Sequence, residues 1–270
     1  MSPARRNILQ SERGRDKLLP GNQEIQKTGW AAAPDTIAIQ ITRDRKGARV
    51  IDGEILLSRL LKEPGPTDTL FDALAASISC ICKGQRVGVL GFGAGGFVAP
   101  LRALECDCLL EGVDLWPEGE ALFRELSGDW KGRIEFTCAE AGGWLRGRRG
   151  LYDLILEDLS EPHPEFGACK PWASLDELPR IIEKKLRPAG VAVFNLLPWP
   201  GASWTAVLAK VARPWPEARL VEFHDYENRL LLASRRLESA TAISRTIRSS
   251  LRELGSSLHN RLRVKNLKSA

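Results

Sequence analysis

Apolar runs alternate with amphipathic stretches through the middle of the chain. The apolar runs predict strands at 86–91, 108–114, 133–138, 151–158 and 190–196. The stretches between and after them predict helices near 95–105, 117–127, 140–147, 174–186 and 202–212. This alternation requires right-handed crossovers and a mainly parallel sheet that is covered on both faces. Two further strands, 219–223 and 229–234, flank a short polar segment and predict a closing antiparallel hairpin.

The region before this alternation has a different pattern. Residues 36–42 alternate between polar and apolar, 44–47 read as a turn, and 48–53 continue as a second strand. They predict a small antiparallel β hairpin unit within 35–66, preceded by a polar, basic arm over 1–34. The break at 64–66 is followed by Thr67 or Asp68, either of which can cap a helix that runs to about Cys82.

The last part of the chain has a helical period. Apolar residues recur at steps of three or four, at Ile243, Ile247, Leu251, Leu254, Leu258 and Leu262. This spacing predicts an amphipathic C-terminal helix within 237–270 whose outer face is basic. Residues 235–270 contain nine Lys and Arg and two acids, a net charge of +7, whereas the whole chain carries +5. The basic character therefore belongs to the tail and not to a basic active site.

Two interpretations of this tail remain open. Its apolar face can dock on this domain or on a second subunit, which makes a homodimer a candidate assembly. Alternatively, its basic face can bind an anionic partner, either nucleic acid or a membrane surface. Together the patterns predict an α/β protein with a Rossmann-like, class I methyltransferase-type domain over 67–236, whose mostly parallel sheet is closed by an antiparallel hairpin.

A glycine cluster carries the clearest chemical signal. The apolar run that begins at Val87 ends in Gly91, Gly93 and Gly95, and a second apolar run ends in Asp114. Glycines at these positions let the backbone turn tightly and approach a ligand closely. An acid at the end of the next strand is placed to accept hydrogen bonds from a ribose diol. The pattern predicts a nucleoside site, and the alternative is a tight turn that binds nothing.

The loops after the next strands supply further candidate groups, because ligands of open α/β sheets bind beyond the carboxyl ends of the strands. The Trp116 indole can cover one side of the nucleoside, and Glu140 can accept a hydrogen bond from an adenine amino group. Asp158 and Glu161 lie three residues apart after the fourth strand. One such carboxylate can hold an ammonium group while the other takes a proton from the attacking nitrogen.

This acid pair has other interpretations. An acid pair near a sulfonium donor also balances its positive charge. In the simplest alternative Asp158 caps a helix and Glu161 is solvated. His163, next in the loop, is either a base or a surface residue between two prolines.

The six cysteines and the lengths of the apolar runs limit which other classes of protein are possible. The cysteines fall as two Cys-x-Cys pairs, 80–82 and 106–108, and as Cys138 and Cys169. A chain of 270 residues can bury a core without disulfides, so free thiols and no metal are expected, with a soft metal on a Cys-x-Cys pair as the alternative. No apolar run approaches the length of a membrane span, and a cytoplasmic protein is expected.

These motifs, taken in chain order, resemble the spermidine synthase family over roughly residues 36–234. The resemblance rests on the segments 51–53, 91–96, 113–117, 139–141 and 152–162. Family members have a Leu-Asp-Gly turn, a Gly-x-Gly-x-Gly-Gly loop, Val-Glu-Ile-Asp-Pro, Gly-Asp-Ala and Asp-Ser-Ser-Asp-Pro at these points. They transfer an aminopropyl group from decarboxylated S-adenosylmethionine to putrescine.

The resemblance implies a role for each acid. Asp158 would match the catalytic aspartate, Glu161 the second acid of that loop, Asp114 the ribose-binding acid and Glu140 the adenine-side acid. The acids at 114, 140 and 161 differ in length from those of the family, and its Asp-Glu-x-x-Tyr-His-Glu segment has no counterpart after the Asp52-Gly53 turn.

The expected function is therefore aminopropyl transfer from an S-adenosylmethionine-type donor to a small amine acceptor. One alternative is an S-adenosylmethionine-dependent methyltransferase. The other is a catalytically silent binding protein that docks through its basic tail.

Overall fold

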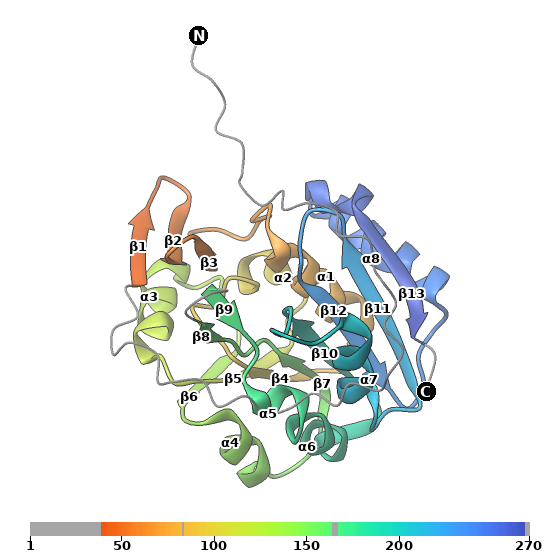
Figure 1. Cartoon of the computed structure of the whole chain (residues 1–270). Coiled ribbons are helices and arrows are strands. Elements are labelled where there is room, and N and C mark those ends of the chain that lie inside the picture. The colour runs from red at the N-terminus through yellow and green to blue at the C-terminus, as the bar shows by residue number, and fades with distance from the viewer. Residues whose placement is uncertain (1–38, 83, 164–166, 268–270) are drawn as a thin grey trace.

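An eight-stranded, mostly parallel sheet forms the centre of the protein (Figure 1). The structure, a computed structural model, describes residues 39–82, 84–163 and 167–267. The sheet has the order β13-β11-β12-β10-β7-β4-β5-β6. Its strands are β4 (Arg86–Leu90), β5 (Leu109–Asp114), β6 (Ile134–Cys138), β7 (Tyr152–Glu157), β10 (Leu186–Leu196), β11 (Glu217–Phe223), β12 (Arg229–Ser234) and β13 (Leu262–Leu267). The predicted parallel sheet with a closing antiparallel hairpin is confirmed.

The central strands are buried on both faces, as their continuous apolar runs require. Within β4, Val87, Val89 and Leu90 are fully buried. This strand pairs in parallel with β5 on one side and with β7 on the other, so that Leu90 lies beside Val113 and Glu157. The register brings the carboxyl ends of β4, β5 and β7 to one edge of the sheet, where the glycines and acids follow.

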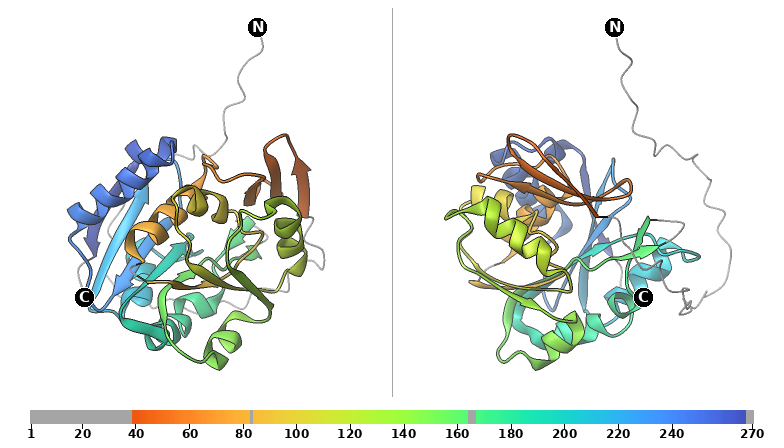
Figure 2. Two further views of the ribbon diagram at one scale, coloured as in Figure 1. Left: turned by 180° about the vertical axis from the view of Figure 1, so that it is seen from behind. Right: turned by 90° about the vertical axis from the view of Figure 1, so that its left-hand side faces the viewer.

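Helices cover both faces of the sheet, as the left and right views of Figure 2 show. One core contains residues of α1 (Leu70–Ile81), α2 (Val98–Ala103), α3 (Pro117–Ser127) and α8 (Ala240–Glu253). The other core contains residues of α4 (Ala141–Gly147), α5 (Trp172–Leu175), α6 (Leu178–Lys185) and α7 (Trp204–Ala212). No helix in the described part of the chain is long and apolar enough to cross a bilayer.

The N-terminal unit is a three-stranded antiparallel sheet instead of a simple hairpin. Strands β1 (Ile39–Arg43) and β2 (Gly47–Asp52) form the predicted hairpin, and β3 (Ile55–Leu61) adds a third strand beside β2. The predicted arm over 1–34 and the predicted strand's first residues lie outside the described residues. This sheet lies beside α3 (Figure 1). A Cβ on Gly96 would come within 2.7 Å of Ser58 Oγ, which shows how closely β3 approaches the glycine loop.

The prediction of one helix through the tail to Leu262 is wrong. The helix α8 ends at Glu253, a short 3-10 helix spans Ser257–Asn260, and Leu262–Leu267 forms the edge strand β13. Gly255, with φ of 75°, follows the end of the helix in the left-handed conformation that favours glycine. Leu262 is buried by strand pairing with β11 and not by a continued helix face.

The apolar face of α8 packs into the main core of this domain. Ile243, Ile247 and Leu251 are almost completely buried in the core that contains α1. The tail is therefore an integral part of the described fold. All six cysteines carry free thiols; Cys108 and Cys169 are buried, and Cys138 is exposed.

Candidate functional site

The glycine loop after β4 has three residues in the left-handed region. Gly91, Gly93 and Gly95 have φ values of 85°, 53° and 66°. A Cβ on Gly91 would come within 2.6 Å of the Asp158 carbonyl oxygen, and one on Gly95 would come within 2.9 Å of the Phe92 ring. A Cβ on Gly93 would have no atom within 4 Å. Two of the glycines are thus required by packing, while the backbone at Gly93 borders open space in which a ligand can approach.

Asp114 holds this loop through its carboxylate. Its Oδ2 accepts a hydrogen bond from Gly93 N at 2.7 Å, and its Oδ1 accepts one from Trp116 N at 3.0 Å. Each carboxylate oxygen has a second lone pair. The acid predicted to bind a ribose therefore also orders the backbone on both sides of the predicted nucleoside position.

Trp116 lies at the start of α3 and is half-buried. A Cβ on Gly119 would come within 2.4 Å of the Trp116 ring and within 2.6 Å of the Gly93 carbonyl oxygen. Only a glycine at 119 lets the indole and the glycine loop pack this closely. The predicted role of the indole as a cover for a nucleoside remains a prediction.

Glu140 caps the helix α4 that follows it. Its Oε1 accepts a hydrogen bond from Gly142 N and its Oε2 accepts one from Gly143 N, both at 2.6 Å. As the N-cap residue, Glu140 reaches forward to the first turn of the helix that follows it, where a carboxylate also interacts favourably with the helix dipole. Both oxygens thus have a structural partner, and the predicted contact with an adenine amino group remains a prediction.

Asp158 directly follows β7 and lies against the glycine loop. Its backbone N–H donates to Leu90 O at 2.8 Å, and its carbonyl packs against Gly91. Its Oδ1 accepts a hydrogen bond from Asn195 Nδ2 at 2.6 Å. The side chain is a loop acid beside the glycines and does not cap a helix, because the strand β8 (Glu161–His163) follows it.

The environment of Asp158 shifts its titration into the physiological range. Burial raises the pKa of the Asp158 carboxyl to about 6. The Lys170 ammonium and the Asn195 amide act against this rise in pKa, whereas the carboxylates of Glu157 and Asp114 add to it. A carboxylate with this pKa is ionised at pH 7 and still basic enough to take a proton, as a general base requires.

A buried ion pair between Lys170 and Glu157 lies next to the loop that contains Asp158. Lys170 Nζ lies 2.8 Å from Glu157 Oε2 and donates to the Leu159 carbonyl, and both side chains are almost completely buried. Glu157 Oε1 accepts hydrogen bonds from Ser174 Oγ at 2.8 Å and from Leu159 N at 3.1 Å. Sequence reasoning missed Lys170, since a single lysine between short apolar segments gives no signal that it forms a buried ion pair.

Glu161 and Asp158 form hydrogen bonds with different residues. It begins β8, which pairs with β9 (Gly167–Cys169), and its Oε1 accepts from the Cys169 thiol at 3.9 Å. Burial raises the pKa of its carboxyl. No hydrogen bond joins Glu161 to Asp158 in the described residues, so its predicted role as a second acid remains a prediction. His163, in the same strand, is buried and is not the surface residue that the flanking prolines suggest.

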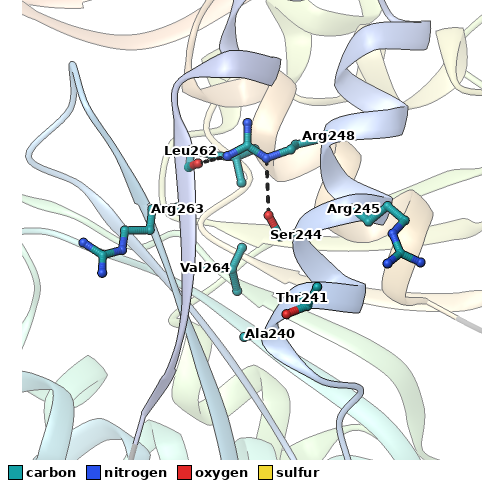
Figure 3. A pocket seen from close by; sticks show the side chains of 8 residues that line it. All are labelled: Ala240, Thr241, Ser244, Arg245, Arg248, Leu262, Arg263 and Val264. Carbon is teal, nitrogen blue, oxygen red and sulfur yellow. Dashed lines mark hydrogen bonds between the residues drawn. The ribbon is translucent and has the colours of Figure 1, made fainter.

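The arginines of the tail do not converge on one point. A cavity of about 530 Å³ lies between α8 and β13, and Figure 3 shows Arg248 spanning it while Arg245 and Arg263 point away from it. The Arg248 guanidinium donates to Ser244 Oγ at 3.3 Å, to His259 O at 2.6 Å and to the Leu262 carbonyl. Arg248 therefore joins the helix to the strand, and an anionic partner of the tail remains a prediction.

Solved structures with this architecture identify the fold. A probable spermidine synthase from Corynebacterium glutamicum matches with a TM-score of 0.64 and 16% sequence identity, over 84% of this chain and 87% of that chain. Spermidine synthase from Thermotoga maritima matches with a TM-score of 0.57 and 14% identity, over 85% of this chain and 79% of that chain. The fold is that of the spermidine synthases and class I methyltransferases.

A methyltransferase shares less of the chain. Human methyltransferase-like protein 13 in complex with SAH matches with a TM-score of 0.54 and 19% identity, over 69% of this chain and 90% of that chain. No protein-family model and no curated protein sequence matches the chain. At these identities the likeness establishes the fold alone.

Proposed function

We propose that this protein is a transferase that binds an S-adenosylmethionine-type donor at the glycine loop and transfers an aminopropyl group to a small amine acceptor. One observation carries the proposal. The Asp158 carboxyl, with a pKa raised to about 6, sits on a residue whose backbone packs directly against Gly91. A proton acceptor is thereby held beside the loop that is proposed to bind the donor.

The donor side of the proposal rests on Gly93 and Asp114. The open space at Gly93 accommodates the nucleoside, and the remaining lone pairs of the Asp114 carboxylate accept from its ribose hydroxyls. The Trp116 indole covers the nucleoside, and Glu140 faces the adenine while it caps α4. The carboxylates of Asp114 and Asp158 interact electrostatically, so a sulfonium cation between them would be stabilised by both.

The chemical step needs one base and one leaving group. The acceptor nitrogen attacks the propyl carbon that is bonded to the sulfonium, a C–N bond forms, and the C–S bond breaks with its electron pair on sulfur. The products are the aminopropylated amine and methylthioadenosine. Asp158 takes the proton that the new secondary amine loses, and Glu161 is proposed to hold the ammonium at the far end of the acceptor.

Aminopropyl transfer is favoured over methyl transfer by the share of this chain that matches each class of solved structure. The two spermidine synthases match 84% and 85% of this chain, whereas the methyltransferase matches 69%. Methyl transfer and a catalytically silent protein are the outcomes that the following experiment separates from the proposal.

The test is a transfer assay with the purified full chain. Decarboxylated S-adenosylmethionine or S-adenosylmethionine is supplied with a set of linear diamines, and products are identified by mass spectrometry. We expect a product heavier by one aminopropyl group, and we expect Asp158→Asn to abolish its formation. Asp129→Asn, a change of an exposed aspartate, serves as the matched control. A methylated product, or no product from either donor, would overturn the proposal.

A further inference from the structure

Two asparagines connect Asp158 to the neighbouring strands β10 and β12 at the same edge of the sheet. Asn195 Nδ2 donates to Asp158 Oδ1 at 2.6 Å, and Asn228 Nδ2 donates to Asn195 Oδ1 at 3.0 Å. The three residues come from the ends of β7, β10 and β12, which are neighbours in the sheet (Figure 1). Asn195 is 8% exposed, and in the described residues its amide is the single hydrogen-bond partner of the Asp158 carboxylate.

The orientation of the Asn195 amide determines whether its hydrogen-bond donor or its acceptor faces Asp158. An asparagine side chain has a donor end and an acceptor end, which exchange places when the amide rotates by half a turn. With Nδ2 toward Asp158, the amide stabilises the ionised carboxylate. With Oδ1 toward Asp158, it would repel the carboxylate and stabilise the protonated acid instead. Asn228 donates to Oδ1, so it selects the first orientation.

We propose that Asn228 fixes the amide of Asn195 in one orientation, and that Asn195 is thereby a positioning residue that keeps Asp158 a proton acceptor. The inference rests on the proposed function for the role of Asp158 as a base. The contacts themselves do not depend on it. Nothing in the sequence indicates this pair, because Asn195 lies within an apolar run and Asn228 lies in a polar turn.

The charged groups that act on Asp158 lie on other sides of it than the two asparagines. Lys170 lies on the loop side and favours the ionised form, while Glu157 in β7 and Asp114 at the end of β5 oppose it. On the side of β10 and β12, Asn195 is the group that acts on the carboxyl. A change at Asn228, which forms no hydrogen bond with Asp158 in the described residues, can therefore act on it through the Asn195 amide.

The deciding variant is Asn228→Asp. A carboxylate has the same shape as the amide but cannot donate to Asn195 Oδ1, so the Asn195 amide turns and presents its oxygen to Asp158. We expect the pKa of Asp158 to rise by about one unit, which is roughly a tenfold loss of the ionised form at a pH below both values. Asn195→Leu, which keeps the branched shape and removes the donor, should raise the pKa of Asp158 in the same direction.

The readout is the carboxyl carbon resonance of Asp158, followed by NMR against pH in the full chain labelled at its aspartates. The Asp158→Asn variant assigns the resonance. Asn260→Asp is the control, because Asn260 lines the same open groove of about 950 Å³ as Asn228, so the substitution adds the same charge to that groove while the hydrogen bond from Asn228 to Asn195 is kept. We expect this control to leave the pKa of Asp158 close to that of the unmodified chain.

Two results would overturn the inference. One is an equal shift in Asn228→Asp and Asn260→Asp, which would mean that charge alone acts on Asp158. The other is an unchanged pKa of Asp158 in Asn195→Leu. The titration needs neither donor nor turnover. If the protein transfers no group but the expected shifts in the pKa of Asp158 are observed, the proposed function is wrong and the inference about Asn228 and Asn195 still holds.

Discussion

The carboxylate of Asp114 accepts a hydrogen bond from the backbone N–H of Gly93, with 2.7 Å between Oδ2 and N. The acid that ends β5 thus fixes Gly93, which among Gly91, Gly93 and Gly95 is the glycine whose added Cβ would meet no atom within 4 Å. A ligand that enters there meets a backbone that is already ordered. Preorganisation of this kind lowers the entropic cost of binding.

Asp114→Asn should weaken donor binding. An amide presents a donor to Gly93 N or to Trp116 N, where the carboxylate presents two acceptors. We expect the affinity for methylthioadenosine to fall by about tenfold, which corresponds to the loss of roughly one hydrogen bond to a charged group. Calorimetric titration measures this change, with Asp129→Asn as the control. Equal affinities of the Asn variant and the unmodified chain would contradict the proposed role of Asp114.

Gly91→Ala should damage the fold and the site together. The added Cβ would lie 2.6 Å from the Asp158 carbonyl oxygen, and the backbone φ of 85° is itself unfavourable for alanine. Gly201→Ala is the matched control, since Gly201 has a φ of 76° and no atom within 4 Å of its added Cβ. We expect the control to lose about 1 kcal/mol of unfolding free energy and Gly91→Ala to lose about 2 kcal/mol more. Similar losses in both variants would show that no clash with Asp158 occurs.

Asp158→Asn should stabilise the protein at neutral pH. The pKa of the Asp158 carboxyl is raised to about 6 in the folded state, so its contribution to stability is present at low pH and is lost as pH rises through about 6. Asparagine mimics the neutral form. We expect a gain of about 1–2 kcal/mol at pH 7.5 that vanishes near pH 4, where the carboxyl is protonated in the folded state.

Denaturant unfolding of Asp158→Asn at several pH values measures that gain. The matched variant Asp129→Asn should show no such dependence, because Asp129 is exposed. A gain that does not change between pH 4 and pH 7.5 would mean that the Asp158 carboxyl is not perturbed.

Glu140→Ala should weaken the start of α4. Removal of its carboxylate leaves the N–H groups of Gly142 and Gly143 without their acceptors. We expect a loss of about 1 kcal/mol of unfolding free energy, and a smaller loss in Glu140→Gln, which retains one acceptor. Glu54→Ala, a change in an exposed turn, is the control for thermal denaturation. Unchanged stability in Glu140→Ala would show that the cap contributes nothing.

The parallel sheet was predictable because its strands are continuous apolar runs between helical stretches. The strands and helices from Arg86 to Ser234 agree with the structure, apart from element ends, the short β8 and β9 strands, and the predicted helix over 174–186, which is divided into α5 and α6. The strand β3 was missed because Ile55–Leu61 does not alternate between polar and apolar residues. In the tail, the step of four from Leu258 to Leu262 continues the helical period by coincidence. Gly255 was the signal that the helix ends.

Residues of the candidate site could be predicted only where a residue type suited to the chemistry follows the end of a predicted strand. The glycines, Asp114 and Asp158 follow the ends of strands, so the sheet brings them together without further information. Asn195, Asn228 and Lys170 act through contacts between segments that are far apart in the sequence. Such contacts depend on strand order and register, and a single sequence does not reveal them.

The most direct test of the central claim is calorimetric titration of the full chain with S-adenosylmethionine, its decarboxylated form and methylthioadenosine. The account predicts that at least the decarboxylated donor and methylthioadenosine bind at one site per chain, and that Gly93→Val, which fills the open space, abolishes this binding. Failure of all three nucleosides to bind the unmodified chain would contradict the claim that the glycine loop is an adenosyl-sulfonium site.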